Sequence, residues 1–179
     1  MLIKKIINKL FLLLMIFLFN TGMSTAETII VDHTGTGDYL TIKEAVAAAD
    51  SGDSVYVMPG TYYEQGILIQ KDITLQGSGF ENCIIDGGEP NFDWPNNTVI
   101  MVDSVNECKI SGFFITNKGM GIHIVNSKSL IEDTIIDSCS TGIFCQYSSE
   151  INMINNQILN CISNAIGILD TSKIFLLSN

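Results

Sequence analysis

The sequence predicts an all-β fold, a right-handed parallel β-helix whose coils are roughly 21 to 25 residues long. A Gly-Ile dipeptide begins at Gly121, Gly142 and Gly167, so it recurs once in each predicted coil. Each dipeptide opens a short apolar alternation, which is followed by a polar corner and a second apolar run. A single coil cannot bury its inward side chains, so coils must stack, and a regular repeat is the mark of such a solenoid.

The polar corners are expected at Ser127, Ser148 and Ser172, and the second apolar runs at Thr134–Asp137 and Gln157–Asn160. Asparagines gather near these corners. An asparagine amide hydrogen-bonds along a stack and the residue tolerates left-handed backbone, so a structural role is predicted for them. They are Asn117, Asn126, Asn155, Asn156 and Asn160.

Residues 1–26 are predicted to be a signal peptide. Three lysines precede the unbroken apolar run Leu10–Phe19, and the small residues Ser24-Thr25-Ala26 precede Glu27. An uncleaved anchor is the alternative, although the run is short for a bilayer span of about 20 residues. We therefore expect a secreted or cell-surface protein, which would be periplasmic in a Gram-negative cell.

The mature part, residues 27–179, is predicted to be one domain and is strongly acidic. It holds all 19 acidic residues but six of the nine lysines, a formal charge of −13, and the chain has no arginine. Nucleic acid and anionic membrane surfaces are therefore disfavoured as partners, since both require clustered cations.

Five cysteines lie in the mature part, without a CxxC pair and without a histidine at zinc-site spacing. An odd number leaves at least one thiol unpaired, and the disulfide state is left open. Cys139 and Cys161 follow their predicted strands at matching positions, which favours an inward stack of reduced cysteines. The five are Cys83, Cys108, Cys139, Cys145 and Cys161.

A first strand is predicted at Glu27–Asp32, followed by a glycine-rich turn and a helix over residues 41–50. Thr41 and Glu44 match a capping box. The apolar positions of the helix fall on one face, so the helix is expected to cap the N-terminal end of the solenoid. Those positions are Ile42, Ala45, Val46 and Ala49.

The early coils are expected to contain strands at Val55–Met58, Ile67–Ile69, Ile73–Leu75 and Ile84–Asp86. Residues 86–98 interrupt the strand pattern of the coils and contain two prolines and the only tryptophan, Trp94. This composition predicts a protruding loop, and loops of this kind often contain functional residues.

The segment Lys173–Asn179 follows a strand without a capping helix. We expect an open apolar edge there, at which the protein could associate with itself or with another chain.

The run Val31–Gly88 resembles the N-terminal part of pectin methylesterases and, more widely, of pectin lyase-like right-handed β-helix proteins. The matching pieces are "GDYLTIKEAV", "GTYYE" at Gly60–Glu64 and "ITLQGSG" at Ile73–Gly79. The repeats resemble those of NosD-like periplasmic copper-associated proteins and of surface β-helix proteins. This resemblance implies the fold, because such motifs belong to the scaffold and occur with several chemistries.

The esterase resemblance implies a site of glutamines and two aspartates on later strands. The corresponding positions, near Gly121–His123, Ser140–Gly142 and Asn164–Gly167, lack these residues. The lyase branch implies clustered acids with calcium and an arginine base, and polygalacturonases imply paired aspartates beside a histidine. Neither pattern is present, so catalysis of these kinds is not predicted.

A carbohydrate-binding strip is one hypothesis for the outer face of the later coils. Ile122 and Ile124 should point inward, so His123 should point outward, in a column with Phe144 and Leu169. Aromatic faces stack on sugars, and Tyr147 and Trp94 are further candidates. The alternative is an ordinary solvated sheet face with scattered apolar residues.

A weak calcium site is a second hypothesis, with Asp86, Glu89, Asp93 and Asp103 as oxygen ligands. A solvated acidic loop is the alternative. Met101, Met120 and Met153 are too dispersed to predict a copper(I) site. No other cofactor is expected.

The sequence thus favours an exported β-helix that acts as a non-catalytic carbohydrate-interacting or surface module. One alternative is a polysaccharide-active enzyme that is truncated before the usual site or lacks it. The other is a structural repeat protein that docks through its open C-terminal edge. The sequence does not name a ligand.

Overall fold

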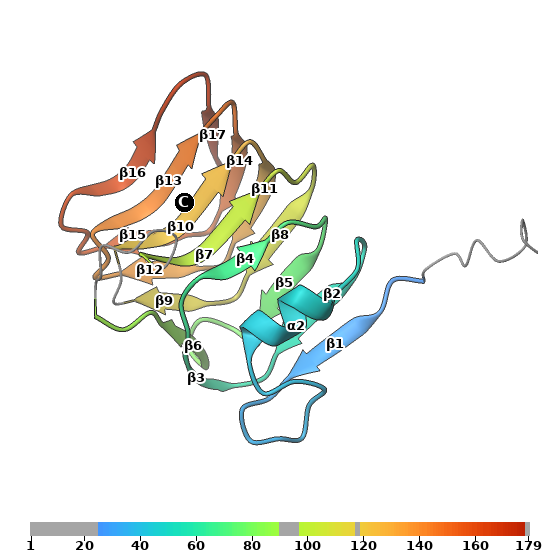
Figure 1. Cartoon of the computed structure of the whole chain (residues 1–179). Helices are drawn as coiled ribbons and strands as arrows, with labels where there is room; N and C mark the ends of the chain where they lie inside the picture. Colours follow the sequence, from blue (N-terminus) through green and yellow to red (C-terminus); the bar gives the residue numbers. More distant parts are fainter. Residues whose placement is uncertain (1–24, 90–96, 117–118, 178–179) are drawn as a thin grey trace, which may run out of the picture.

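The computed structural model describes residues 25–89, 97–116 and 119–177 and confirms the right-handed parallel β-helix. Its strands form three sheets in which every ladder is parallel (Figure 1). The largest sheet has seven strands. In spatial order they are β1 (Thr28–Val31), β2 (Ser54–Val57), β5 (Thr74–Gly77), β8 (Cys108–Ser111), β11 (Lys128–Glu132), β14 (Glu150–Ile154) and β17 (Lys173–Leu177).

Two five-stranded sheets complete each coil. One contains β4 (Ile67–Ile69), β7 (Thr98–Asp103), β10 (Met120–Val125), β13 (Thr141–Gln146) and β16 (Asn164–Ile168). The other contains β3 (Gly60–Tyr63), β6 (Cys83–Asp86), β9 (Phe114–Thr116), β12 (Ile135–Asp137) and β15 (Gln157–Leu159). The strand β3 is not among the predicted strands, because its residues are recognised only as part of the "GTYYE" motif.

The core consists of columns of like side chains, one from each coil. In the sheet of β4 to β16 the register aligns five isoleucines, of which the first four are fully buried: Ile67, Ile100, Ile122, Ile143 and Ile166. β-branched side chains suit a strand, and burying each one contributes roughly 1.5–3 kcal/mol. The coils therefore form the hydrophobic core by stacking, as the repeat in the sequence predicts.

The register corrects the third repeat of the sequence pattern. Ile143 pairs with Ile166, so Ala165 takes the place of Gly121 and Gly142, whereas Gly167 pairs with Phe144. The last coil is longer than the one before it, because the corner before β14 and the turn between β15 and β16 each contain one extra residue. These two extra residues place the true third repeat at Ala165, and the Gly-Ile pair at Gly167 is a separate occurrence of the dipeptide two residues further on.

Glycine is required at the two true repeat positions by the close approach of the neighbouring strand. A Cβ added at Gly121 would lie 2.7 Å from Ile136 Cγ2, and one added at Gly142 would lie 2.5 Å from Ile158 Cγ2. Both contacts are shorter than van der Waals distance. The two residues therefore let the sheets of one coil approach each other.

Serines link successive coils at the corner before the seven-stranded sheet. The Ser127 Oγ accepts from the Val105 backbone N–H at 3.0 Å, Ser149 Oγ accepts from the Ser127 N–H at 3.2 Å, and Ser172 Oγ accepts from the Ser149 N–H at 3.0 Å. Ser148 lies in this corner, as predicted, but the residue equivalent to Ser127 is Ser149. The corner after Gln146 is one residue longer than the corner after Val125, and Ser148 is exposed.

The corner asparagines have the predicted structural role. Asn126, Asn155 and Asn160 have φ values of 44°, 53° and 50°. The Asn160 amide donates to Asp137 of the preceding coil at 2.7 Å, and Asn156 donates to the Ile131 carbonyl at 2.8 Å. Asn117 lies outside the described residues.

The helix α2 (Ile42–Ala48) lies beside β1, β2 and β4 at the N-terminal end of the solenoid (Figure 1). The Thr41 hydroxyl accepts from the Glu44 N–H at 3.2 Å and donates to the Glu44 carboxylate at 2.8 Å. The four apolar residues predicted to share one face are buried. The helix is shorter than the predicted range of 41–50.

The "GTYYE" motif proves to be structural. The Glu64 carboxylate accepts from the first two backbone N–H groups of α2, at 2.8 Å from Ile42 and 2.9 Å from Lys43, and burial raises the pKa of this carboxyl. The Tyr62 hydroxyl donates to the Met58 carbonyl at 2.9 Å. A Cβ on Gly60 would clash with the His33 ring. The motif thus fastens the helix to the first coil.

The five cysteines all lie in the described ranges and are thiols, not disulfides. Cys139 and Cys161 occupy equivalent places, and each Sγ lies 3.6 Å from the carbonyl oxygen two residues earlier, as expected for a reduced stack. Burial raises the pKa of Cys83 to about 11 and that of Cys108 to about 12. The latter two thiols are therefore protonated at neutral pH and poor as ligands or nucleophiles.

The last described coil exposes large apolar side chains. Its strands β15, β16 and β17 each stand at the end of a sheet. The exposed residues are Leu159, Ile162, Ile168, Leu169, Phe175, Leu176 and Leu177.

Within the described ranges, no helix is long and apolar enough to span a bilayer. The predicted signal peptide lies almost wholly outside those ranges.

Truncation of the isoleucine column should destabilise the fold. We expect Ile122→Ala to lower the free energy of unfolding by about 2–5 kcal/mol, because removal of this fully buried side chain leaves a cavity in the core. Leu68→Ala is the control, because Leu68 lies on the outer side of the same sheet and is 43% exposed. Urea denaturation followed by circular dichroism would measure both, and equal losses for the two variants would contradict the column as the core.

Candidate ligand groove

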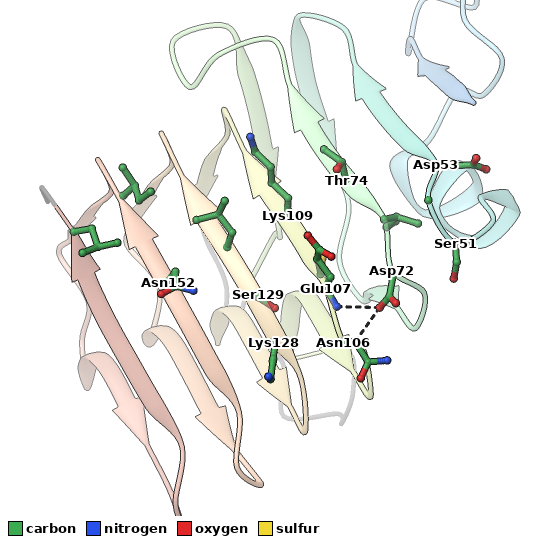
Figure 2. A pocket seen from close by; sticks show the side chains of 16 residues that line it. Ser51, Asp53, Asp72, Thr74, Asn106, Glu107, Lys109, Lys128, Ser129 and Asn152 are labelled. Carbon is green, nitrogen blue, oxygen red and sulfur yellow. Dashed lines mark hydrogen bonds between the residues drawn. The ribbon is translucent and has the colours of Figure 1, made fainter. Parts of the chain in front are cut away.

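A hollow of about 800 Å³ runs over the outer face of the seven-stranded sheet. Figure 2 shows its lining side chains spread over neighbouring strands. Strand alternation sends every second side chain outward, and the register sets those side chains in columns across the coils. The central column is Thr74, Lys109, Leu130 and Asn152. We call this hollow the groove.

The groove mixes apolar and hydrogen-bonding surface. Leu130, Ile154 and Leu177 provide apolar lining, whereas Thr74 and Asn152 provide a hydroxyl and an amide. At one end the Asp72 carboxylate accepts from the backbone N–H groups of Asn106 and Glu107, at 2.8 and 3.0 Å (Figure 2). These bonds fix the corner that forms the rim.

A second hollow of about 310 Å³ lies on the same sheet and shares Lys109 with the groove. Its lining includes the half-buried ring of Tyr56, the exposed amide of Gln76 and the carboxylate of Glu132. Lys109 and Glu132 form an ion pair. Partly exposed pairs of this kind contribute little to stability, so both groups are accessible to an outside ligand at small cost.

Charges alternate along the edge of the seven-stranded sheet from which Glu107 and Lys128 line the groove. Lys128, Glu150 and Lys173 are aligned in register on β11, β14 and β17, and Glu107 holds the equivalent place in the coil before Lys128. Three of the five described lysines belong to strands of this sheet, namely Lys109, Lys128 and Lys173. In so acidic a chain the sheet therefore concentrates the cationic groups.

Sequence reasoning missed this groove. Its residues come from successive coils, are far apart along the chain and share no motif. Lys128, Glu150 and Lys173 do recur once per coil, but that periodicity becomes visible only once the register of the strands is known.

The predicted strip around His123 lies on a different sheet and is not exposed as expected. His123 is only 1% exposed, although its neighbours Ile122 and Ile124 face the core. Its ring centroid lies 5.3 Å from that of Phe144, which is half-buried. The third member of the column is Gly167, where Leu169 was expected. Sugar binding by His123 and Phe144 stays a prediction.

Burial lowers the pKa of His123 to about 4, against a weaker opposite influence of Asp103. The imidazole is therefore neutral at neutral pH. Among the other predicted sugar-binding residues, Tyr147 is 59% exposed at a corner, and Trp94 lies outside the described residues.

The predicted calcium ligands are only partly described. Asp86 accepts from the Gly88 N–H at 2.9 Å, and Asp103 accepts from the Gln70 amide at 3.1 Å, while Glu89 is exposed. Asp93 lies outside the described residues. Calcium binding by this set stays a prediction.

Comparison with known proteins identifies the family. Residues 46–179 match the profile of the family described as "Periplasmic copper-binding protein (NosD)". The chain belongs to the NosD family. That match covers most of the described coils, including those that form the groove.

The described residues of this NosD-family chain do not fit a copper centre. Within the described ranges, no three side chains of His, Cys, Asp or Glu come together. Met101 is the register neighbour of His123, which brings one thioether beside one imidazole, whereas His33 packs against Tyr62 near the N-terminal end. Copper sites need more donors than this pair provides.

Pectin methylesterases are similar in sequence and in fold. Pectinesterase 3 of Solanum lycopersicum is 34% identical over 92 residues, which are 46% of this chain and 17% of that protein. The pectin methylesterase PemA of Erwinia chrysanthemi superposes with a TM-score of 0.50 at 13% identity, over 73% of this chain and 50% of that one.

A pectin methylesterase in complex with hexasaccharide VII superposes with a TM-score of 0.51 at 14% identity, over 74% of this chain and 56% of that one. The chain thus spans about half of the solved relatives and a smaller part of the curated one. These likenesses confirm the pectin lyase-like fold predicted from the sequence.

The buried histidine should make stability depend on pH. The folded-state pKa of His123 is about 4 and its ordinary value is 6.5, so the stabilisation that it contributes is complete above pH 6.5. It is lost as the pH falls toward 4, because the unfolded chain then binds the proton more readily. Melting temperatures should decline over that range.

An NMR titration of the imidazole signals would test this directly. The mature chain has two histidines, so a His33→Gln variant assigns the remaining signal to His123. We expect that signal to stay in its neutral position down to about pH 5, one unit above the pKa. A midpoint near 6.5 would contradict the burial of His123.

Proposed function

We propose that this exported β-helix protein is a non-catalytic module that binds a polysaccharide along the outer face of its seven-stranded sheet. The observation that carries the proposal is the groove, in which apolar side chains lie beside a hydroxyl, an amide and the ammonium group of Lys109. Sugars have an apolar face and a rim of hydroxyls, and a surface of this composition suits both.

The repetition of the coils supports a polymeric ligand. Parallel strands are about 4.8 Å apart, so the outward columns present similar groups at regular intervals across the sheet. A chain of sugar residues can lie across several coils and contact each in turn. The solved pectin methylesterase with a bound hexasaccharide has the same fold, which is consistent with such a ligand.

Export supports the same interpretation. The predicted signal peptide would bring the domain to where polysaccharides of cell walls and surfaces are found. The family is described as periplasmic, and a pectinesterase is a curated relative. A role as an active polysaccharide hydrolase or esterase is the alternative, although the catalytic residues that it requires are absent from the corresponding positions of the sequence.

Binding of oligosaccharides to the purified chain from Glu27 to Asn179 would test the proposal. We expect binding of at least one of the hexasaccharides of galacturonic acid, glucose and N-acetylglucosamine, measured by isothermal titration calorimetry. Lys109→Ala should weaken it at least fivefold, because Lys109 borders both hollows.

Tyr63→Ala is the matched control, because Tyr63 is highly exposed on β3 of another sheet. An equal loss of affinity in both variants would place the ligand elsewhere. Release of methanol or of reducing ends by the wild-type chain would instead support the enzyme alternative.

A second candidate function is docking through the last coil. The observation that favours it is the cluster of exposed apolar residues on β16, β17 and the turn between β15 and β16. A sheet end with exposed apolar side chains pairs readily with further strands.

Light scattering of the same chain over a range of concentrations would test docking. We expect the mass to rise with concentration, and Leu176→Lys to reduce that rise, because Leu176 is among the most exposed residues of β17. A constant monomer mass would contradict association of the chain with itself.

A further inference from the structure

The corner before the seven-stranded sheet holds a residue in the left-handed region of backbone conformation in each later coil, and the corner of Tyr147 holds a second one, Ser148 (φ 60°). The ladder pairs Val125 with both Asp103 and Gln146, so the next residues along the chain are equivalent. The pairing of Cys145 with Ile168 extends the series by one coil. The members are Ser104 (φ 58°), Asn126 (φ 44°), Tyr147 (φ 56°) and Asp170 (φ 60°).

Tyr147 is the exception in this series. Serine, asparagine and aspartate are short and polar, and asparagine and aspartate tolerate this conformation better than other non-glycine residues. A tyrosine has no such compensation, because its Cβ crowds the backbone and its ring cannot bond locally. Strained residues of this kind persist at binding sites more often than elsewhere.

Packing does not explain the tyrosine either. Tyr147 is 59% exposed, so more than half of its surface remains in solvent. Within the described part of the chain, its ring is not paired with another aromatic ring, whereas His123 packs against Phe144 and His33 against Tyr62. The left-handed conformation of Tyr147 therefore lowers the stability of the fold, and packing in the core does not offset this loss.

The surroundings of Tyr147 are rich in hydrogen-bonding groups. Its backbone N–H donates to the Asp170 carboxylate at 3.3 Å, whereas the N–H of Asn126 donates to a backbone carbonyl. The hydroxyls of Ser148 and Thr171 are 2.7 Å apart and exposed. A corner that combines an exposed aromatic residue with a carboxylate and two hydroxyls matches the two kinds of surface that a sugar presents.

The corner of Tyr147 stacks on the corner that contributes Lys128 to the groove, although its own residues do not line the groove. Asn106, Glu107 and Lys128 line the groove at the same corner in the two preceding coils. Tyr147 follows them in the next coil, shortly before the strand β14 that carries Asn152. A ligand that extends from Lys128 across one further coil at this edge reaches the corner of Tyr147.

We propose that Tyr147 is a sugar-stacking residue at the corner next to the groove, held in a left-handed conformation for binding and not for folding. The inference rests on the proposed function, because it takes the same polysaccharide as ligand. It adds a subsite formed by the Tyr147 ring, the Asp170 carboxylate and the hydroxyls of Ser148 and Thr171.

The test replaces Tyr147 by the residue that the preceding coil has at this position. We expect Tyr147→Asn to raise the melting temperature by about 2–4 °C, since asparagine relieves the strain. The same variant should bind the hexasaccharides of galacturonic acid, glucose or N-acetylglucosamine at least fivefold more weakly than the wild-type chain. Tyr147→Phe keeps the ring and should bind within twofold of the wild type.

The outcomes separate this inference from the proposed function. Undiminished binding by Tyr147→Asn, with wild-type binding intact and sensitive to Lys109→Ala, would overturn the subsite and leave the groove in place. A fall in the melting temperature of Tyr147→Asn would overturn it without any ligand, because the tyrosine would then serve folding. Absence of binding by the wild-type chain would overturn both proposals.

Discussion

The stacking register of the coils is the constraint on which the rest of the structure depends. Each strand forms its backbone hydrogen bonds only with strands of the neighbouring coils, so an unpaired coil would leave both edges of every strand unsatisfied. Because every ladder is parallel, equivalent residues lie directly beside one another. A side chain is thus selected for its fit with copies of itself, as in the column of five isoleucines.

The same constraint explains the corners. A turn that recurs in each coil leaves the same backbone groups unpaired each time, and a side chain from the next coil satisfies them. Ser149 does so for the N–H of Ser127, and Asn156 does so for the N–H of Thr134. One inserted residue, Ser148, is tolerated because it is exposed to solvent and leaves the serine ladder intact.

The outward-facing side chains of the sheets need neither pack in the core nor satisfy the backbone groups of the corners. They are therefore free to serve a function. The groove and the Tyr147 corner both lie outside the core, and their residues differ from coil to coil. The motifs shared with pectin methylesterases belong instead to the scaffold, since Glu64 caps the helix and Gly60 makes room for His33. Similarity in these motifs therefore indicates a shared fold and not a shared chemistry. The low sequence identity of the superposed structures agrees with this.

The sequence by itself determined the fold class, the inward isoleucines, the amphipathic helix and the structural asparagines, because each depends on a local pattern or a repeat. It took Gly167 for the third repeat, although that Gly-Ile dipeptide is out of register. It did not identify Ser149 as the equivalent of Ser127, because one extra corner residue shifts the register without a trace in composition. Only the tertiary structure decided that His123 is buried and that Lys109, Leu130 and Asn152 share one groove. The physical reason is that such residues meet across coils, and their neighbours are set by the hydrogen-bonded register and not by their order along the chain.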